Sequence, residues 1–346
     1  MLTILLFILG LQPLHEAGYR GEGKTIAVID AGFYRANDED LFDQSHIIDS
    51  FDLLPDSLNR GNMFTGEDDA HGCQVLSTML HESSEFTGTA PDANYILIRS
   101  EDIKAEYKAE TENLIRGLHI ADSLNADIIT ISLGYNTFDK DIGNYTFDSL
   151  NGQTRLAQAV TAMARRGRLV CVAAGNSGSS TWKKLLVPAD ADSALTVGAV
   201  DSLGNAASFS SWGPTADGRI KPEVCAWGKE TKIYSPITNQ LVRRDGTSYS
   251  TPEIAGMAAC IWQAVPSLSA IELRDLIIRS ASLYPNHDDQ RGYGIPDAEK
   301  AIQIATALQD SKAQANRHSA RKYLENGQLV IQIGNRKIDL TGQEIQ

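Results

Sequence analysis

Short apolar runs alternate with stretches of helical periodicity in the first part of the chain. The runs lie at Lys24–Asp30, Asn94–Arg99, Asp127–Ser132, Leu169–Ala174 and Ala194–Val200. Runs of this length are typical of strands that are buried on both faces. Because strand and helix patterns alternate, the sequence predicts βαβ units, and hence a mostly parallel central sheet with helices on both faces.

Helical spacing of apolar residues fills the intervals between these runs. Helices are expected after His71, over about 114–124 and 156–163, from Ser248 to Pro266, over about 270–282, and from about Ala298. Right-handed crossovers bring the carboxyl ends of parallel strands to one edge, where ligands of open α/β sheets bind. Asp30, Ser132 and Asn176 all fall at such ends, so we expect a functional site there.

Composition narrows the possible functions. The formal net charge of -13 argues against nucleic-acid binding, because that function needs a clustered basic face. The four cysteines, Cys73, Cys171, Cys225 and Cys260, show no CxxC spacing and are too sparse for a disulfide scaffold. A zinc site is therefore not expected. Cys171 and Cys260 lie in apolar runs and are interpreted as core residues.

Four residues have the chemistry of a serine hydrolase. Ser248 lies at a loop-to-helix junction within Gly246–Pro252, where free backbone amides favour negative charge. Pro252 is expected in the first helical turn, where its missing N–H costs little. His71 precedes a helix and could act as the base, Asp30 could orient it, and Asn176 could donate to an oxyanion.

Each of these residues also has an ordinary structural explanation. Ser248 could be a helix cap, Asp30 and Asn176 could be turn residues, and a histidine before a helix is often simply exposed. These explanations do not account for all four together, in this order, each at a predicted strand end or helix start. The combination favours catalysis.

Five segments resemble the signatures of the subtilase family, in the same order along the chain. They are Val28–Gly32, His71-Gly72, Ser132–Gly134, Ala173–Gly178 and Gly246–Pro252. The chain order Asp, His, Ser separates subtilisin-like enzymes from chymotrypsin-like enzymes and α/β-hydrolases. The resemblance covers roughly Gly18 to Ile302, and the segments between the signatures look like a secreted bacterial branch.

The resemblance implies a subtilisin-like three-layer sandwich and a serine endopeptidase that works through an acyl-enzyme. It assigns Ser248 as nucleophile, His71 as general acid/base, Asp30 as the orienting carboxylate and Asn176 as the oxyanion donor. The substrate-binding residues that it implies are Ser132, Leu133, Gly134 and Gly175, with Leu186 and Val187 at the base of the specificity pocket. It implies a polypeptide substrate and no cofactor for the chemistry.

Three departures from the family pattern stand near the expected reacting groups. Ala31 occupies a position where the family usually has Ser or Thr, Cys73 replaces a Thr, and Tyr249-Ser250 replaces a Met-Ala pair. None removes a reacting group, so we expect them to affect rate and selectivity. Cys73 suggests the hypothesis that a mercurial reaching it would displace His71 and inhibit.

The expected organisation is a leader or N-terminal segment at 1–17, a catalytic domain at 18–305 and a helix and β-hairpin tail at 306–346. The apolar run Leu2–Leu9 is too short to span a bilayer and lacks a positive n-region, so we favour an opening segment of the folded domain over a signal peptide. The tail alternates apolar and polar residues around Gly334-Asn335, a hairpin signal.

Partners and location follow from the same resemblance. We expect a monomer without a membrane span, in a bacterial-type secreted or cell-envelope location, although the export signal is incomplete. Subtilases often bind calcium, and the acidic groups Asp38–Asp40, Glu67–Asp69 and Asp288-Asp289 are candidates. Solvated charge is the preferred explanation for them, since no EF-hand spacing occurs.

Other functions stay open at this stage. A catalytically silent subtilase fold would keep the groove and bind peptides without turnover. A structural or adhesive protein would use the tail as its working part. An esterase would carry a Gly-x-Ser-x-Gly elbow, which does not surround Ser248.

Overall fold

The computed structural model describes residues 4–54, 62–67, 70–139, 143–318, 320–333 and 336–345. Contacts between residues divide the chain into two units, Met1–Ala301 and Ile302–Gln346. In the described part of the chain, no helix combines the length and the apolar character needed to cross a bilayer.

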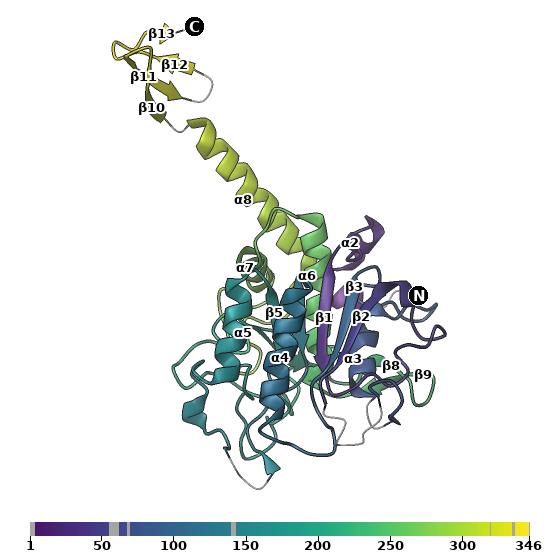
Figure 1. The fold of residues 1–346 in the computed structure, drawn as a ribbon. Helices are drawn as coiled ribbons and strands as arrows, with labels where there is room; N and C mark the ends of the chain where they lie inside the picture. Colours follow the sequence, from purple (N-terminus) through teal and green to yellow (C-terminus); the bar gives the residue numbers. More distant parts are fainter. Residues whose placement is uncertain are drawn as a thin grey trace. The chain divides into compact units, whose positions relative to one another are not determined.

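A seven-stranded parallel sheet forms the centre of the first unit, in the order β2-β3-β1-β4-β5-β6-β7 (Figure 1). The strands are β1 (Thr25–Asp30), β2 (Ile47–Asp52), β3 (Asn94–Arg99), β4 (Ile128–Ile131), β5 (Leu169–Ala173), β6 (Leu195–Val200) and β7 (Val224–Trp227). Every residue of β4 to β7 is buried, which explains the continuous apolar runs. The five predicted strands are confirmed, whereas β2 and β7 have no counterpart among them.

Helices cover both faces of this sheet. On one face α4 (Glu110–Ser123) and α5 (Arg155–Arg165) pack against each other and against β1, β3 and β5. On the other, α3 (His71–Leu80) packs against α6 (Thr247–Ala264), which contacts β1 and β4 to β7. Next to α6 lies α7 (Ala270–Ser280), which begins with a capping box between Ser269 and Glu272. The predicted three-layer α/β arrangement is confirmed.

Helix α6 is buried on all sides from Thr247 to Trp262, and its second half is almost entirely apolar. Pro252 lies in its second turn and not in the first, so the prediction for this residue is wrong. A proline there leaves the carbonyl four residues earlier without its helical donor, and that carbonyl belongs to Ser248. The hydroxyl of Ser132 supplies the missing hydrogen bond, donating to the Ser248 carbonyl oxygen at 2.8 Å.

The N-terminal residues belong to the first unit. They form two short helices, α1 (Ile4–Ile8) and α2 (Gln12–Glu16). Leu5, Leu9 and Leu11 are fully buried, and the carbonyl of Leu9 accepts a hydrogen bond from the N–H of Ala298. The apolar character of this segment is thus used in packing.

The first unit also contains an antiparallel pair of strands, β8 (Thr231–Ser235) and β9 (Gln240–Arg244). The second unit contains most of α8 (Ala298–His318) and an antiparallel sheet of β10 (Ala320–Glu325), β11 (Gln328–Ile333), β12 (Arg336–Ile338) and β13 (Glu344–Ile345). The predicted turn residues Gly334-Asn335 lie outside the described residues, although β11 and β12 on either side of them pair antiparallel. A second hairpin turn, at Asn326-Gly327, has positive φ at both residues, as a type I′ turn requires.

The parallel sheet sets the position of the site. Asp30 ends β1, Ser132 follows β4, and Gly175 and Asn176 follow β5. Because β1, β4 and β5 are parallel neighbours, these residues meet at one edge. The N-termini of α3 and α6, with His71 and Ser248, come to the same edge.

Candidate active site

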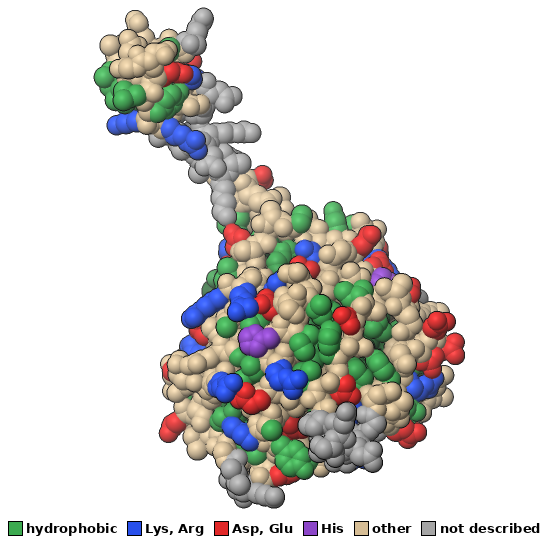
Figure 2. All heavy atoms as spheres, in the orientation of Figure 1, with side chains coloured by type: hydrophobic (Ala, Val, Ile, Leu, Met, Phe, Trp, Pro, Cys, Tyr) green, Lys and Arg blue, Asp and Glu red, His purple; other side chains and the backbone are tan. Residues whose placement is uncertain are grey.

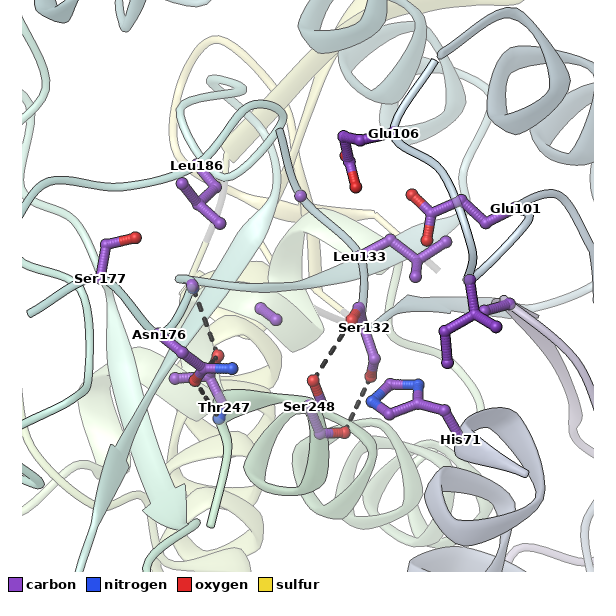
Figure 3. Close-up of a pocket in the computed structure, with 15 residues that line it drawn as sticks. His71, Glu101, Glu106, Ser132, Leu133, Asn176, Ser177, Leu186, Thr247 and Ser248 are labelled. Atoms are coloured by element: carbon purple, nitrogen blue, oxygen red, sulfur yellow. Dashed lines mark hydrogen bonds between the residues drawn. The ribbon is translucent and has the colours of Figure 1, made fainter. Parts of the chain in front are cut away.

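A cleft of about 330 Å³ opens at the carboxyl ends of the strands (Figure 3). Its walls come from the loops after β1, β3, β4 and β5 and from the first residues of α3 and α6. The lining residues are Ala31, His71, Glu101, Ile103, Glu106, Ser132, Leu133, Gly134, Ala173, Gly175, Asn176, Ser177, Leu186, Thr247 and Ser248. Asp30 lies beneath the cleft and is fully buried.

Asp30 and His71 form a close pair. Nδ1 of His71 lies 2.6 Å from Oδ1 of Asp30, which also accepts the backbone N–H of Ala31 at 2.8 Å. With Nδ1 as donor, Nε2 of His71 is the free acceptor nitrogen. Burial by itself lowers the pKa of His71, but the charge and the hydrogen bond of Asp30 outweigh it, so that this pKa lies above its ordinary value.

The second carboxylate oxygen of Asp30 has a different environment. Oδ2 is buried and has no hydrogen-bond partner among the described residues. The adjacent residue is Ala31, which offers no hydroxyl. Alanine at position 31, where the family usually has Ser or Thr, therefore coincides with an unsatisfied Oδ2 of Asp30.

Ser248 lies in the first turn of α6, beside His71 (Figure 3). Its hydroxyl donates to the carbonyl oxygen of Ser132 at 3.3 Å. Within the described part of the chain no hydrogen bond joins Ser248 to His71, and rotation about the Cα–Cβ bond of Ser248 is the motion that would redirect the hydroxyl. Such contacts are often long in unliganded enzymes and tighten when substrate binds.

Thr247 fixes the orientation of the Asn176 side chain. Its backbone N–H and its hydroxyl donate to Oδ1 of Asn176 at 2.9 and 3.1 Å, while the Gly175 N–H donates to the Thr247 hydroxyl at 3.2 Å. Because Oδ1 accepts both bonds from Thr247, the Nδ2 group of Asn176 remains available to donate a hydrogen bond in the cleft. The structure thus brings Asn176 next to the first turn of α6.

Two glycines allow Leu186 to close one side of the cleft. A Cβ atom added to Gly134 would lie 2.8 Å from Cβ of Leu186, and one added to Gly175 would lie 2.6 Å from its Cγ. Gly175 also has φ +105, which other residues rarely adopt. Leu186 lines the cleft, whereas Val187, the other residue expected at the specificity pocket, is fully buried and does not line it.

Comparison with known proteins agrees with this geometry. The sequence profile described as "Subtilase family" matches residues 21–295. The chain belongs to the subtilase family. By that membership it is a serine-type endopeptidase, a class that needs no cofactor for catalysis and acts on polypeptides.

Two relatives show how far the similarity extends. Subtilisin DY of Bacillus licheniformis is 31% identical over 287 residues, which cover 82% of this chain and 91% of that protein. Serine protease AprX of Bacillus subtilis (strain 168) is 29% identical over 314 residues, covering 82% of this chain and 66% of AprX. This subtilase therefore spans slightly less than two thirds of the length of AprX.

Solved structures share the fold at lower identity. The CspB protease of Clostridium perfringens has a TM-score of 0.73 at 14% identity, covering 88% of this chain and 98% of that one. The prenylagaramide maturation protease PagA has a TM-score of 0.66 at 24% identity. The match covers 86% of this chain and 99% of PagA. The subtilase fold of this chain is thus found in proteins whose sequences have diverged widely.

Several residues at the site of this subtilase were missed by the sequence analysis. Thr247 precedes the nucleophile candidate and could have been found from its place in the Gly246–Pro252 segment. Tyr249, noted in the sequence only as a departure from the family pattern, places its ring 6.1 Å from that of His71 and donates to Oε1 of Gln74 at 2.9 Å. Glu101 and Glu106, which line the cleft, carry no signal in the sequence beyond their position after β3.

Two of the acidic residues suggested for calcium, Asp38 and Asp288, already have hydrogen-bond or ion-pair partners. Oδ2 of Asp38 binds Arg35 and its Oδ1 accepts the N–H of Asp40. Asp288 binds Arg291 through Oδ2 and accepts two backbone N–H groups through Oδ1. Both carboxylates are therefore already paired, and the group Glu67–Asp69 lies partly outside the described residues.

Proposed function

We propose that this chain hydrolyses peptide bonds with Ser248 as nucleophile, His71 as general acid/base, Asp30 as orienting carboxylate and Asn176 as oxyanion donor. The observation that carries the proposal is the 2.6 Å contact between Asp30 and His71 beside the hydroxyl of Ser248. It supports this assignment because a serine needs an adjacent, correctly oriented base to become a nucleophile.

The reaction follows from these positions. Nε2 of His71 takes the proton of the Ser248 hydroxyl while Oγ attacks the carbonyl carbon. The negative charge that develops on the carbonyl oxygen is stabilised by Nδ2 of Asn176 and the backbone N–H of Ser248, at the N-terminus of α6. His71 then gives its proton to the leaving amine, and water releases the acyl group by the same steps in reverse.

Substrate binding uses the strand end after β4. An extended peptide pairs its backbone with Ser132–Gly134, while Gly175 leaves space for the peptide close to Asn176. The side chain of the residue that supplies the scissile carbonyl, called P1, enters the side of the cleft bounded by Leu186. The apolar character of Leu186 favours an apolar P1 residue.

The remaining assignments are also proposals. The catalytic domain spans 18–305, residues 1–17 precede it, and 306–346 form a tail. We further propose a monomer that is exported to the cell envelope or secreted. The paired acidic residues described above do not support a calcium site at Asp38 or Asp288.

A fluorophosphonate probe tests the proposal, because it labels an activated serine without requiring the right peptide. Wild-type protein and Ser250→Ala should be labelled, whereas Ser248→Ala should not. Ser250 is a matched control, since its hydroxyl is buried two residues further along α6 and donates to the Thr247 carbonyl. No labelling of a folded wild-type protein would favour the catalytically silent, peptide-binding alternative.

A further inference from the structure

Three glutamates gather along one wall of the cleft. Carboxylate oxygens of Glu101, Glu106 and Glu110 lie within 4.8 Å of one another. Glu101 and Glu106 line the cleft itself. Glu110 stands behind them and is already occupied, because its Oε1 accepts the N–H of Asp102 at 2.7 Å and its Oε2 that of Tyr107 at 2.8 Å.

No cation of the described chain neutralises this wall. None of the three glutamates forms an ion pair there, and the ammonium of the nearby Lys108 is directed elsewhere. It donates to the Gly143 carbonyl at 3.1 Å and lies over the ring of Tyr145 at 3.6 Å. Among the described residues, this wall of the cleft therefore carries carboxyl groups without a counterion.

Burial and like charge hold these carboxyl groups away from their usual titration range. Burial, and then the neighbouring Asp139, raise the pKa of Glu106 to about 7. Burial also raises the pKa of Glu110 to about 7 and that of Glu101 well above its ordinary value, with Glu106 adding to both shifts. A positive group placed among them would relieve this repulsion.

A second observation at the same place concerns Tyr135, which is only 1% exposed. Its hydroxyl lies next to Glu101 and interacts with it electrostatically, yet it has no partner with standard hydrogen-bond geometry in the described chain. A buried polar group without a partner is costly. The Tyr135 hydroxyl thus faces Glu101 without completing a hydrogen bond of standard geometry.

The path of an extended substrate decides which of its side chains meets this wall. Leu186 and the two cleft glutamates lie on opposite sides of the 132–134 segment (Figure 3). Side chains of an extended peptide alternate between its two faces. If P1 enters the Leu186 side, the residue before it (P2) and the residue two further back (P4) point toward Glu101 and Glu106.

We propose that Glu101 and Glu106 form a subsite for a lysine or arginine side chain at P2 or P4 of the substrate. This inference rests on the proposed function. The small number of free carboxylate oxygens favours a basic side chain over a divalent cation. Calcium takes six to eight oxygen ligands, whereas both oxygens of Glu110 already accept backbone hydrogen bonds.

The test compares matched fluorogenic tetrapeptides with Lys, Arg, Gln or Glu at P2 or P4 and an identical P1. For the wild type, kcat/KM with Lys or Arg should exceed that with Gln by about tenfold or more at one of these positions. The ratio should fall toward one in Glu101→Gln/Glu106→Gln. It should persist in Glu112→Gln, an exposed neighbour on α4 that pairs with Arg155 outside the cleft.

A charge reversal guards against loss of folding as the explanation. Glu106→Lys should shift the preference toward Glu at the same position, a gain that misfolding cannot produce. A wild type that labels with fluorophosphonate but shows no basic preference at P2 or P4 would overturn the subsite while leaving the protease assignment intact. Calcium that raises the Tm of the wild type but not of the double glutamine variant, without any such preference, would instead identify a metal site.

Discussion

Oδ1 of Asn176 accepts two hydrogen bonds from Thr247, one from the backbone N–H at 2.9 Å and one from the hydroxyl at 3.1 Å. The pair determines which end of the carboxamide faces the cleft. Since Thr247 directly precedes Ser248, one turn of α6 positions both the proposed nucleophile, Ser248, and the proposed oxyanion donor, Asn176. Through Asn176, the Thr247 side chain thereby sets the geometry of the proposed oxyanion-forming step.

Separate replacements of Asn176 and Thr247 should distinguish the hydrogen bond to the oxyanion from the positioning of the Asn176 side chain. Asn176→Ala is expected to lower kcat by about 10²- to 10³-fold, the range found when such a donor is removed from subtilisin. Thr247→Val should lower kcat by roughly tenfold with little change in KM, because one of two orienting bonds is lost. Thr251→Val, which removes a hydroxyl that donates within α6, is the matched control. Equal kcat in Thr247→Val and wild type would show that the backbone bond alone suffices.

The pairing of His71 with Asp30 predicts the acid limb of the pH profile. His71 must be neutral to act as base, and its pKa is raised, so kcat/KM should rise with pH around a midpoint above the ordinary histidine value of 6.5. Asp30→Asn removes the charge that raises this pKa and disturbs the tautomer. We expect its midpoint to move to lower pH and its kcat to fall on the order of 10⁴-fold. A midpoint that does not move would contradict the role given to Asp30.

The unsatisfied Oδ2 of Asp30 predicts that Ala31→Ser stabilises the protein. The new hydroxyl can supply the missing donor, and the Tm of a Ser248→Ala background, chosen to prevent self-cleavage, should rise by a few degrees. Ala27→Ser, on the preceding strand β1, is the contrasting variant. It places a hydroxyl in the apolar core and should lower the Tm. Thermal unfolding followed by circular dichroism distinguishes the two, and a lower Tm for Ala31→Ser would refute the prediction.

The position of Leu186 predicts how selectivity at P1 can be changed. Leu186→Ala should enlarge the pocket beside Gly134 and Gly175, whose missing side chains the leucine now covers. The ratio of kcat/KM for a P1 tryptophan to that for a P1 alanine should increase about tenfold. The measurement uses peptides that differ only at P1. An unchanged ratio would mean that the P1 side chain lies elsewhere in the cleft.

Cysteine reactivity should depend on unfolding. All four cysteines are free and fully buried, and burial raises the pKa of each thiol. A thiol-reactive dye should therefore react with almost none of them in the native protein and with all four after denaturation. For the same reason a mercurial is not expected to reach Cys73 and inhibit the folded enzyme. Rapid native-state modification of Cys73 would show that α3 opens locally.

The central fold could be predicted because its signal is local. Buried strands such as β3 are continuously apolar, and the parallel order of neighbouring strands places Asp30, Ser132 and Asn176 at one edge without any further information. Strand β2 was not predicted because it lies at the edge of the sheet and is mostly exposed. Its sequence therefore shows neither an alternation of apolar and polar residues nor a continuous apolar run. The hairpin of β8 and β9 likewise has no glycine in its turn to mark it.

The fine structure of the site depends on contacts between distant residues. Pro252 was placed one turn too early because sequence alone does not show where α6 begins, and only the fold reveals that Ser132 satisfies the carbonyl that the proline leaves free. The same holds for Glu101, Glu106 and Glu110. Their convergence results from the path of the segment between β3 and α4. This segment has no periodic sequence pattern from which its path could be predicted.

Helix α6 carries Ser248 in its first turn and is enclosed from Thr247 to Trp262. An element of this kind opens only when the whole domain does, so its amide hydrogens should be among the slowest to exchange with solvent. Another copy of the protease should therefore be unable to cleave the backbone of α6 until the fold is lost. Any loss of activity that requires α6 to open should therefore proceed at the rate of global unfolding.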